Sequence, residues 1–301
     1  MNVPPHARSL VDRLTQLRQH QQDGKRSPHK PLLVLLALGR LSRTGSSAMD
    51  WTEVEEQLGQ LLIEFGPPRK GPAHPEFPFT RLRSDQVWHL SRDVPNDQLK
   101  DLRAEPIVGS FPAEIEAELT SDPASITTVA RLLVEDQFPF TVAPDVLSAV
   151  GLDPDVVFGS ERVPKAQHQD RKRSSTWRHE ILEAWDRSCA FCGFDGQLAG
   201  AVVGIEAAHV RWFNFGGPDD ADNGLALCSL HHKLLDRGVL GLSDPETVVV
   251  SRTYSARTQE GRRVYDLHGL QIRPRPGTPL PAEEYVAWHS QEVFKAGSLT
   301  G

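Results

Sequence analysis

All three cysteines of the chain lie in two short motifs with the spacing of metal ligands. Cys189 and Cys192 form a CxxC pair, and Cys228 and His231 form a CxxH pair after 35 intervening residues. Together they offer four soft or borderline ligands, the set that tetrahedral structural zinc prefers. Three cysteines cannot form a closed set of disulfides, and their clustering favours a metal site in a reducing compartment. The sequence therefore predicts one zinc ion bound by these four residues.

Two histidines and an asparagine in the same region are not needed by zinc. His231 and His232 are adjacent, so on a helix they point about 100° apart and only one can face the zinc. His209 lies in the strand-like segment GIEAAHVRW, and Asn223 follows after a glycine-rich turn. The order His209, Asn223, His232 within a pair of zinc knuckles resembles the HNH nuclease family over about residues 185–240. That resemblance implies a ββα-metal fold, a hairpin followed by a helix, and metal-assisted phosphodiester hydrolysis.

The HNH resemblance implies a role for each of these side chains. His209 would be the general base that takes a proton from the attacking water, because an imidazole exchanges protons near neutral pH. His232 would ligate a divalent cation, Mg²⁺, Mn²⁺ or similar, which neutralises charge on the phosphate and the leaving oxygen. Asn223 would tie the hairpin to the helix and orient the site, or help to bind the cation.

The sequence departs from the family pattern at one ligand position. Many family members carry an acidic metal ligand directly before the first histidine, where this chain has Ala208. Asp236 shares a helical face with His232 and could supply a ligand or make a structural hydrogen bond at the helix end. Glu206 is expected on the opposite face of its strand from His209, so it is not assigned to the site.

The surrounding segments predict elements that would position these residues. Residues 175–188, STWRHEILEAWDRS, predict a helix capped by Ser175 or Thr176, and the alternating segment TVVVSRTY at 247–254 predicts a strand. Residues 159–175 have almost no apolar content and predict an interdomain linker.

The N-terminal half predicts mainly helices. Leucine spacing indicates an amphipathic helix at 7–21, and the apolar run after Pro31 predicts a buried central helix. Asp50 and Glu53 form a capping-box pattern before a third helix. The five prolines of 66–82 predict a long ordered loop, because proline disrupts regular helix. VWHL after it predicts a short strand, and SITTVARLLVEDQF a further helix.

Three of these segments, PHKPLLVLLAL, PEFPFTRL and VWHL, resemble the sulfur-binding domain of phosphorothioation-dependent restriction endonucleases. That family joins such a domain to a C-terminal HNH nuclease in this order. The resemblance implies a largely helical domain with a shallow apolar pocket, ringed by basic side chains, for DNA in which sulfur replaces a non-bridging phosphate oxygen. His29 and Lys30 would match the family's basic pair, and Phe77 and Pro78 its aromatic–proline wall. Arg81 stands where a small residue is more usual.

The net charge of −7 is unevenly distributed along the chain. Residues 1–43 carry a net +6, residues 93–160 a net −10 and residues 161–178 a net +4. A protein can present a basic face to phosphates although its total charge is acidic. Such runs are also common as solvated faces, so charge alone leaves both interpretations open.

Composition excludes two broad classes. Apolar residues make up 39% and charged residues 24%, too rich in core formers for a disordered chain. The longest apolar run, residues 31–39, is far shorter than the roughly 20 residues that span a bilayer. No secretory h-region is recognisable at the N-terminus, and we expect a cytoplasmic protein.

The sequence thus predicts an α+β protein with a mainly helical DNA-reading domain at 1–158, a basic linker at 159–175 and a zinc-stabilised HNH nuclease domain at 176–301. The expected partner is double-stranded, phosphorothioate-modified DNA. Two alternatives stay open: an HNH nuclease that reads methylated or unmodified DNA, and a zinc-stabilised DNA-binding regulator that does not cleave. A nuclease that cuts both strands commonly acts as a homodimer, although no interface is recognisable in the sequence.

Overall fold

The computed structural model describes residues 9–17, 24–159 and 175–296. The chain divides into two compact units, Met1–Ala166 and Gln167–Gly301. Both combine helices with small antiparallel sheets, which confirms the expected α+β class. The predicted linker lies almost entirely outside the described residues, so its limits stay predictions. None of the described helices is long and apolar enough to cross a membrane.

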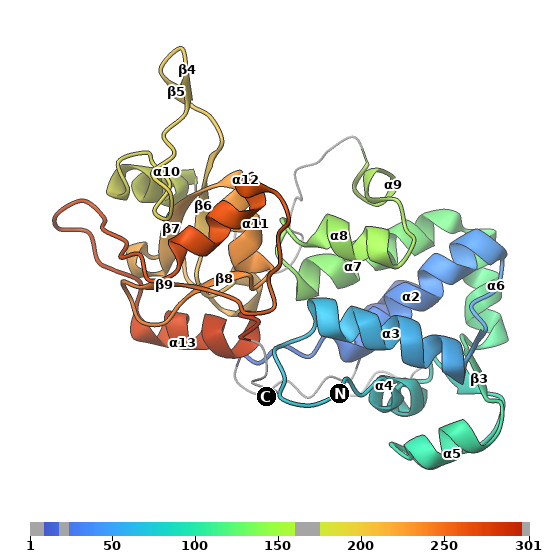
Figure 1. Cartoon of the computed structure of the whole chain (residues 1–301). Coiled ribbons are helices and arrows are strands. Elements are labelled where there is room, and N and C mark those ends of the chain that lie inside the picture. Colours follow the sequence, from blue (N-terminus) through green and yellow to red (C-terminus); the bar gives the residue numbers. More distant parts are fainter. Residues whose placement is uncertain (1–8, 18–23, 160–174, 297–301) are drawn as a thin grey trace, which may run out of the picture. The chain divides into compact units, whose positions relative to one another are not determined.

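The N-terminal unit is built around α2 (His29–Thr44), the blue helix in Figure 1. Its run of Leu, Val and Ala is apolar on nearly every side, and the helix is buried along most of its length, as predicted. Pro31 lies in the first turn, where no intrahelical partner needs its missing N–H. The helix ends at Gly45, whose φ of 77° lies in the left-handed region that favours glycine.

Four helices contact α2: α3 (Trp51–Phe65), α4 (Glu76–Arg81), α6 (Ala113–Ser121) and α7 (Pro123–Gln137). The other helices of the unit are α1 (Leu10–Thr15), α5 (Leu99–Ala104), α8 (Ala143–Ala149) and α9 (Pro154–Phe158). Three short strands, β1 (Met49–Asp50), β3 (Val108–Ser110) and β2 (His89–Leu90), form an antiparallel sheet in that order. The strand predicted in VWHL and the helix predicted in SITTVARLLVEDQF are therefore confirmed. The first helix is shorter than the predicted 7–21, and residues 1–8 and 18–23 lie outside the described ranges.

Two local predictions about the N-terminal unit, the helix after Asp50 and the proline-rich loop, were confirmed only in part. Asp50 is the N-cap of α3, but its side chain makes no cap hydrogen bond, and Glu53 instead pairs with Arg40 of α2. The proline-rich stretch is not a loop throughout, because it ends in α4. Pro75 is the N-cap of α4 and Pro78 lies in its first turn, positions whose N–H groups have no partner within a helix. Both prolines are therefore compatible with the helix.

The C-terminal unit contains the predicted hairpin followed by a helix. Strands β6 (Ile205–His209) and β7 (Gly224–Cys228) pair antiparallel, with His209 opposite Gly224, and α11 (Ser229–Asp236) follows directly. Helix α10 (Ser175–Ala184) contacts both strands, and a Cβ at Gly224 would lie only 2.2 Å from Ile181 Cδ1 of α10. Glycine at this position thus allows the close approach of helix and hairpin.

Further strands and helices belong to this unit, and the pair of β4 (Gln197–Leu198) and β5 (Ala201–Val202) projects away from the others (Figure 1). The others are β8 (Leu240–Leu242), β9 (Val248–Val250), α12 (Gln259–Arg262) and α13 (Glu283–Glu292). The strand predicted in TVVVSRTY is β9, which pairs with β8, and β8 contacts α11 and α13. The hairpin and α11 are thereby supported by packed elements on several sides.

Candidate metal centre and active site

The four predicted zinc ligands converge in the structure. Cys189 and Cys192 lie in the turn after α10, Cys228 ends β7, and His231 lies in α11. Their ligand atoms all lie within 4.8 Å of one another, with His231 Nδ1 3.4 Å from Cys189 Sγ. Hydrogen bonds from Cys228 and His231 lower the pKa of the Cys189 thiol, whereas burial raises that of Cys192 and the hydrogen bond with Cys189 raises that of Cys228, so Cys189 is the thiol most readily ionised before a metal ion binds. This Cys₃His group could hold a metal ion such as zinc.

His209, the predicted general base, is held on several sides. It is the last residue of β6 and its side chain is 8% exposed. The indole of Trp177 stacks on the imidazole with ring centroids 4.0 Å apart and planes 16° from parallel. His209 Nε2 lies 2.8 Å from Asp219 Oδ1. Sequence reasoning missed Asp219, although its position directly after the Gly-Gly-Pro turn could have drawn attention to it.

Asn223 is fully buried, and its side chain holds the loop that joins β6 to β7. Its Nδ2 donates to Arg211 O at 3.1 Å and Pro218 O at 2.9 Å, and its Oδ1 accepts from Arg211 N at 2.8 Å. These bonds join the two ends of the loop. They differ from the expected tie between hairpin and helix, because the amide side chain points back into the turn that precedes it.

His232 lies between two carboxylates. Its Nδ1 is 2.7 Å from Glu206 Oε2, and its Nε2 is 3.3 Å from Asp236 Oδ2. Burial lowers the pKa of His232, but Asp236 and then Glu206 outweigh it and raise the value to about 9. The sequence analysis assigns Glu206 no role, because strand alternation directs it away from His209. The packing of α11 against β6 brings His232 into contact with it.

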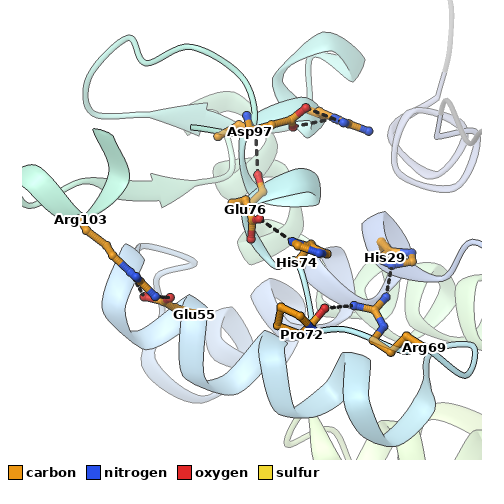
Figure 2. Close-up of polar contacts among 10 residues, drawn as sticks. His29, Glu55, Arg69, Pro72, His74, Glu76, Asp97 and Arg103 are labelled. Carbon is orange, nitrogen blue, oxygen red and sulfur yellow. Dashed lines mark hydrogen bonds and ion pairs between the residues drawn. The ribbon is translucent and has the colours of Figure 1, made fainter. Parts of the chain in front are cut away.

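The predicted basic pair of the N-terminal unit begins α2. Arg69 Nη2 lies 3.0 Å from His29 Nε2, and Arg69 Nη1 donates to Pro72 O at 3.2 Å (Figure 2). Burial, then the charges of Arg69 and Arg26, lower the pKa of His29 to about 4. His29 is therefore neutral at pH 7 and accepts the hydrogen bond from Arg69. Lys30 instead pairs with the buried Asp85 at 2.5 Å.

Phe77 lies between two side chains of the same region. Its ring stacks on His74, with centroids 4.7 Å apart and planes 9° from parallel, and the Arg81 guanidinium lies 4.6 Å from its centroid. Arg81 also pairs with Asp97 at 2.5 Å. Pro78 is buried in α4.

His29 lies near His74, which stacks on Phe77 (Figure 2). Lys30, the other member of the predicted basic pair, forms its ion pair with Asp85. Arg69 and His74 were not singled out from the sequence, although both lie in the proline-rich stretch 66–82.

Two family models match the chain. One, described as ScoMcrA-like, DNA sulfur-binding domain, matches residues 7–155, and the other, HNH endonuclease, matches residues 189–243. No curated protein sequence matches.

Several solved structures resemble parts of the chain. The sulfur-binding domain of ScoMcrA complexed with phosphorothioated DNA is 19% identical, covering 48% of this chain and 96% of that chain, with a TM-score of 0.41. The sulfur-binding domain of SprMcrA, also complexed with phosphorothioated DNA, is 23% identical, covering 47% and 91%, with a TM-score of 0.40. The type IV phosphorothioation-dependent restriction endonuclease ScoMcrA is 12% identical, covering 85% and 97%, with a TM-score of 0.38. The two family models, and not these structures, identify a DNA sulfur-binding domain in the N-terminal unit and an HNH endonuclease domain in the C-terminal unit.

Proposed function

Because this chain joins a ScoMcrA-like DNA sulfur-binding domain to an HNH endonuclease domain, we propose that it is a modification-dependent DNA endonuclease. In this proposal the N-terminal unit binds phosphorothioate-modified duplex DNA, and the C-terminal unit hydrolyses phosphodiester bonds nearby. The presence of both domains in one chain is the observation that carries the proposal.

The region around His29 supports recognition of an anion with an apolar edge. Arg69, Arg26 and Arg81 all place positive charge near His29. A phosphorothioate keeps the negative charge of a phosphate, but its sulfur is larger and more weakly hydrated than oxygen, so it gains from apolar contact. Phe77 offers such a contact beside the cations. His29, Lys30, Phe77, Pro78 and Arg81 stay the predicted site residues, with Arg69 added from the geometry.

For cleavage, His209 takes a proton from a water molecule. The resulting hydroxide forms a new P–O bond, the bond from phosphorus to the leaving oxygen breaks, and that oxygen takes up a proton from solvent. A divalent cation such as Mg²⁺ or Mn²⁺ would stabilise the negative charge that develops on these oxygens. His232 would release its proton on binding such a cation, and would then offer an imidazole nitrogen beside the carboxylates of Glu206 and Asp236, donor types that suit the ion. Asn223 holds the loop beside the base.

The remaining features of the proposal follow from the ligand chemistry and from the reaction. The Cys₃His group binds a structural zinc ion, and its reduced thiols suit a cytoplasmic protein. Cleavage of both strands suits a homodimer, in which each copy supplies one active site.

A cleavage assay with matched duplexes tests the proposal. The full chain is incubated with Mg²⁺ or Mn²⁺ and three duplexes of one sequence: unmodified, phosphorothioated and methylated. We expect cleavage of the phosphorothioated duplex alone, and no cleavage by His209→Ala. Cleavage of the methylated or unmodified duplex at the same rate would refute the sulfur preference. Binding without cleavage under every cation condition would instead favour a DNA-binding regulator.

A further inference from the structure

Asp219 lies against the proposed general base, and neither the sequence motif nor the proposed mechanism assigns it a role. We infer that Asp219 is a positioning residue that fixes the tautomer and orientation of His209. The inference rests on the proposed nuclease function, since it concerns the base of that reaction. It is carried by three observations: the contact itself, the clamp around the imidazole, and the way in which the loop bearing Asp219 is held.

The clamp around His209 comes from three separate segments. Trp177 of α10 stacks on the imidazole, with ring centroids 4.0 Å apart. Phe213, in the 3-10 helix after β6, has its ring centroid 5.8 Å from that of the imidazole. Asp219 Oδ1 lies 2.8 Å from Nε2, with the carboxylate 19% exposed. The two aromatic rings limit tilting of the imidazole plane. The carboxylate determines which edge of the ring faces the loop, because it contacts Nε2.

Asp219 is not a free surface acid, because both of its chain neighbours are held by buried side chains. Asn223 Nδ2 donates to Pro218 O at 2.9 Å, directly before Asp219. Trp177 Nε1 donates to Asp220 O at 3.0 Å, directly after it. Trp177 therefore both covers the imidazole and anchors the loop that carries its partner. Fixing the neighbouring peptide groups places the Asp219 carboxylate without an entropic cost at the moment of reaction.

The consequence for the chemistry follows from what a carboxylate can do. An ionised carboxylate only accepts hydrogen bonds, so His209 must carry its proton on Nε2. The lone pair of the neutral imidazole is then on Nδ1, which is the atom that accepts the proton from water. The imidazolium that forms is stabilised by the adjacent negative charge of Asp219. The Asp219 carboxylate itself does not take up a proton.

A different role, as a ligand of the catalytic cation, is disfavoured by the contacts of the two carboxylates. Glu206 contacts His232, whereas Asp219 contacts His209. The two carboxylates therefore act on different histidines.

The test compares Asp219→Asn with Asp219→Glu, and with Asp220→Asn as a matched control that alters an exposed carboxylate on the same loop. The first measurement is the ¹⁵N spectrum of histidine-labelled full-length protein, with the His209 signals assigned by their loss in His209→Ala. We expect the Nε2–H tautomer in the wild type and in Asp220→Asn, and a mixed or Nδ1–H population in Asp219→Asn. An unchanged His209 tautomer in Asp219→Asn would overturn the inference. This measurement does not require that the protein cleave DNA, so its failure is distinguishable from failure of the proposed function.

The second measurement is cleavage kinetics. Loss of a carboxylate that sets the tautomer of a catalytic histidine costs up to about 10⁴-fold in rate, so kcat of Asp219→Asn should fall by at least about 10-fold while KM stays within about twofold. Asp219→Glu should recover part of the loss, and Asp219→Asn should add little in a His209→Ala background. Wild-type kcat in Asp219→Asn would contradict a positioning role. Recovery of its rate at raised cation concentration would also contradict it, since that result identifies a metal ligand.

Discussion

Acidification should destabilise the N-terminal unit through His29. This residue begins α2, and burial followed by the charges of Arg69 and Arg26 lowers its pKa to about 4. In the unfolded chain the imidazole has its ordinary pKa of about 6.5. Between these two values the unfolded state binds more protons than the folded state, so stability must fall as the pH falls. The contribution is fully present above about pH 6.5 and is lost progressively towards pH 4.

The magnitude follows from the size of the pKa difference. Each pH unit below about 6.5 costs about 1.4 kcal/mol per group, so the loss is about 2 kcal/mol at pH 5 and approaches about 3 kcal/mol near pH 4. A typical domain has only about 5–15 kcal/mol of total stability, so the loss should be readily measurable.

Hydrogen exchange of α2 provides the assay, because the buried amides of this helix report opening of the N-terminal unit alone. The free energy of opening is measured at pH 7 and pH 5 for the wild type, His29→Asn and His89→Asn, which removes an exposed imidazole from the same unit. We expect the wild type and His89→Asn to lose about 2 kcal/mol more than His29→Asn between the two pH values. Equal losses in all three proteins would refute the reasoning, since His29 would then protonate as easily in the folded state.

Three further predictions concern the other sites. Cys228→Ser should reduce the zinc content of the protein, measured by elemental mass spectrometry. It should also lower the melting temperature of the C-terminal unit, because metal binding contributes directly to folding. Unchanged zinc content and melting temperature would exclude the Cys₃His site. His209→Ala and His232→Ala should each reduce cleavage at least about 100-fold while zinc content and DNA affinity persist; near wild-type cutting by either would contradict the mechanism. Phe77→Ala should lower the preference for phosphorothioated over unmodified duplex by about 1 kcal/mol in paired titrations at one salt concentration, and an unchanged preference would place the sulfur contact elsewhere.

Local patterns were enough to predict the Cys₃His group and most of the elements around it. The CxxC and CxxH motifs each place two side chains within one turn. The Cys₃His group forms when the fold brings these two turns together. The apolar run after Pro31 can be satisfied only in a core, and it forms the buried helix α2. The prolines before Arg81 predicted a loop, but Pro75 and Pro78 lie at the start of α4. A proline is compatible with the first turn of a helix and disrupts a helix only further along.

Apart from Asp236, which lies one helical turn after His232, the partners of the site histidines were decided by tertiary structure. His209 contacts Asp219, which lies 10 residues later in the chain, and His232 contacts Glu206, which lies 26 residues earlier. In the N-terminal unit, Arg69 reaches His29 across 40 residues, and Asp85 reaches Lys30 across 55. Motif spacing shows which side chains have the right chemistry, but a hydrogen bond or ion pair requires atoms within about 3–4 Å. The paths of the loops and the packing of α11 and α2 set those distances, and no short-range pattern in the sequence encodes them.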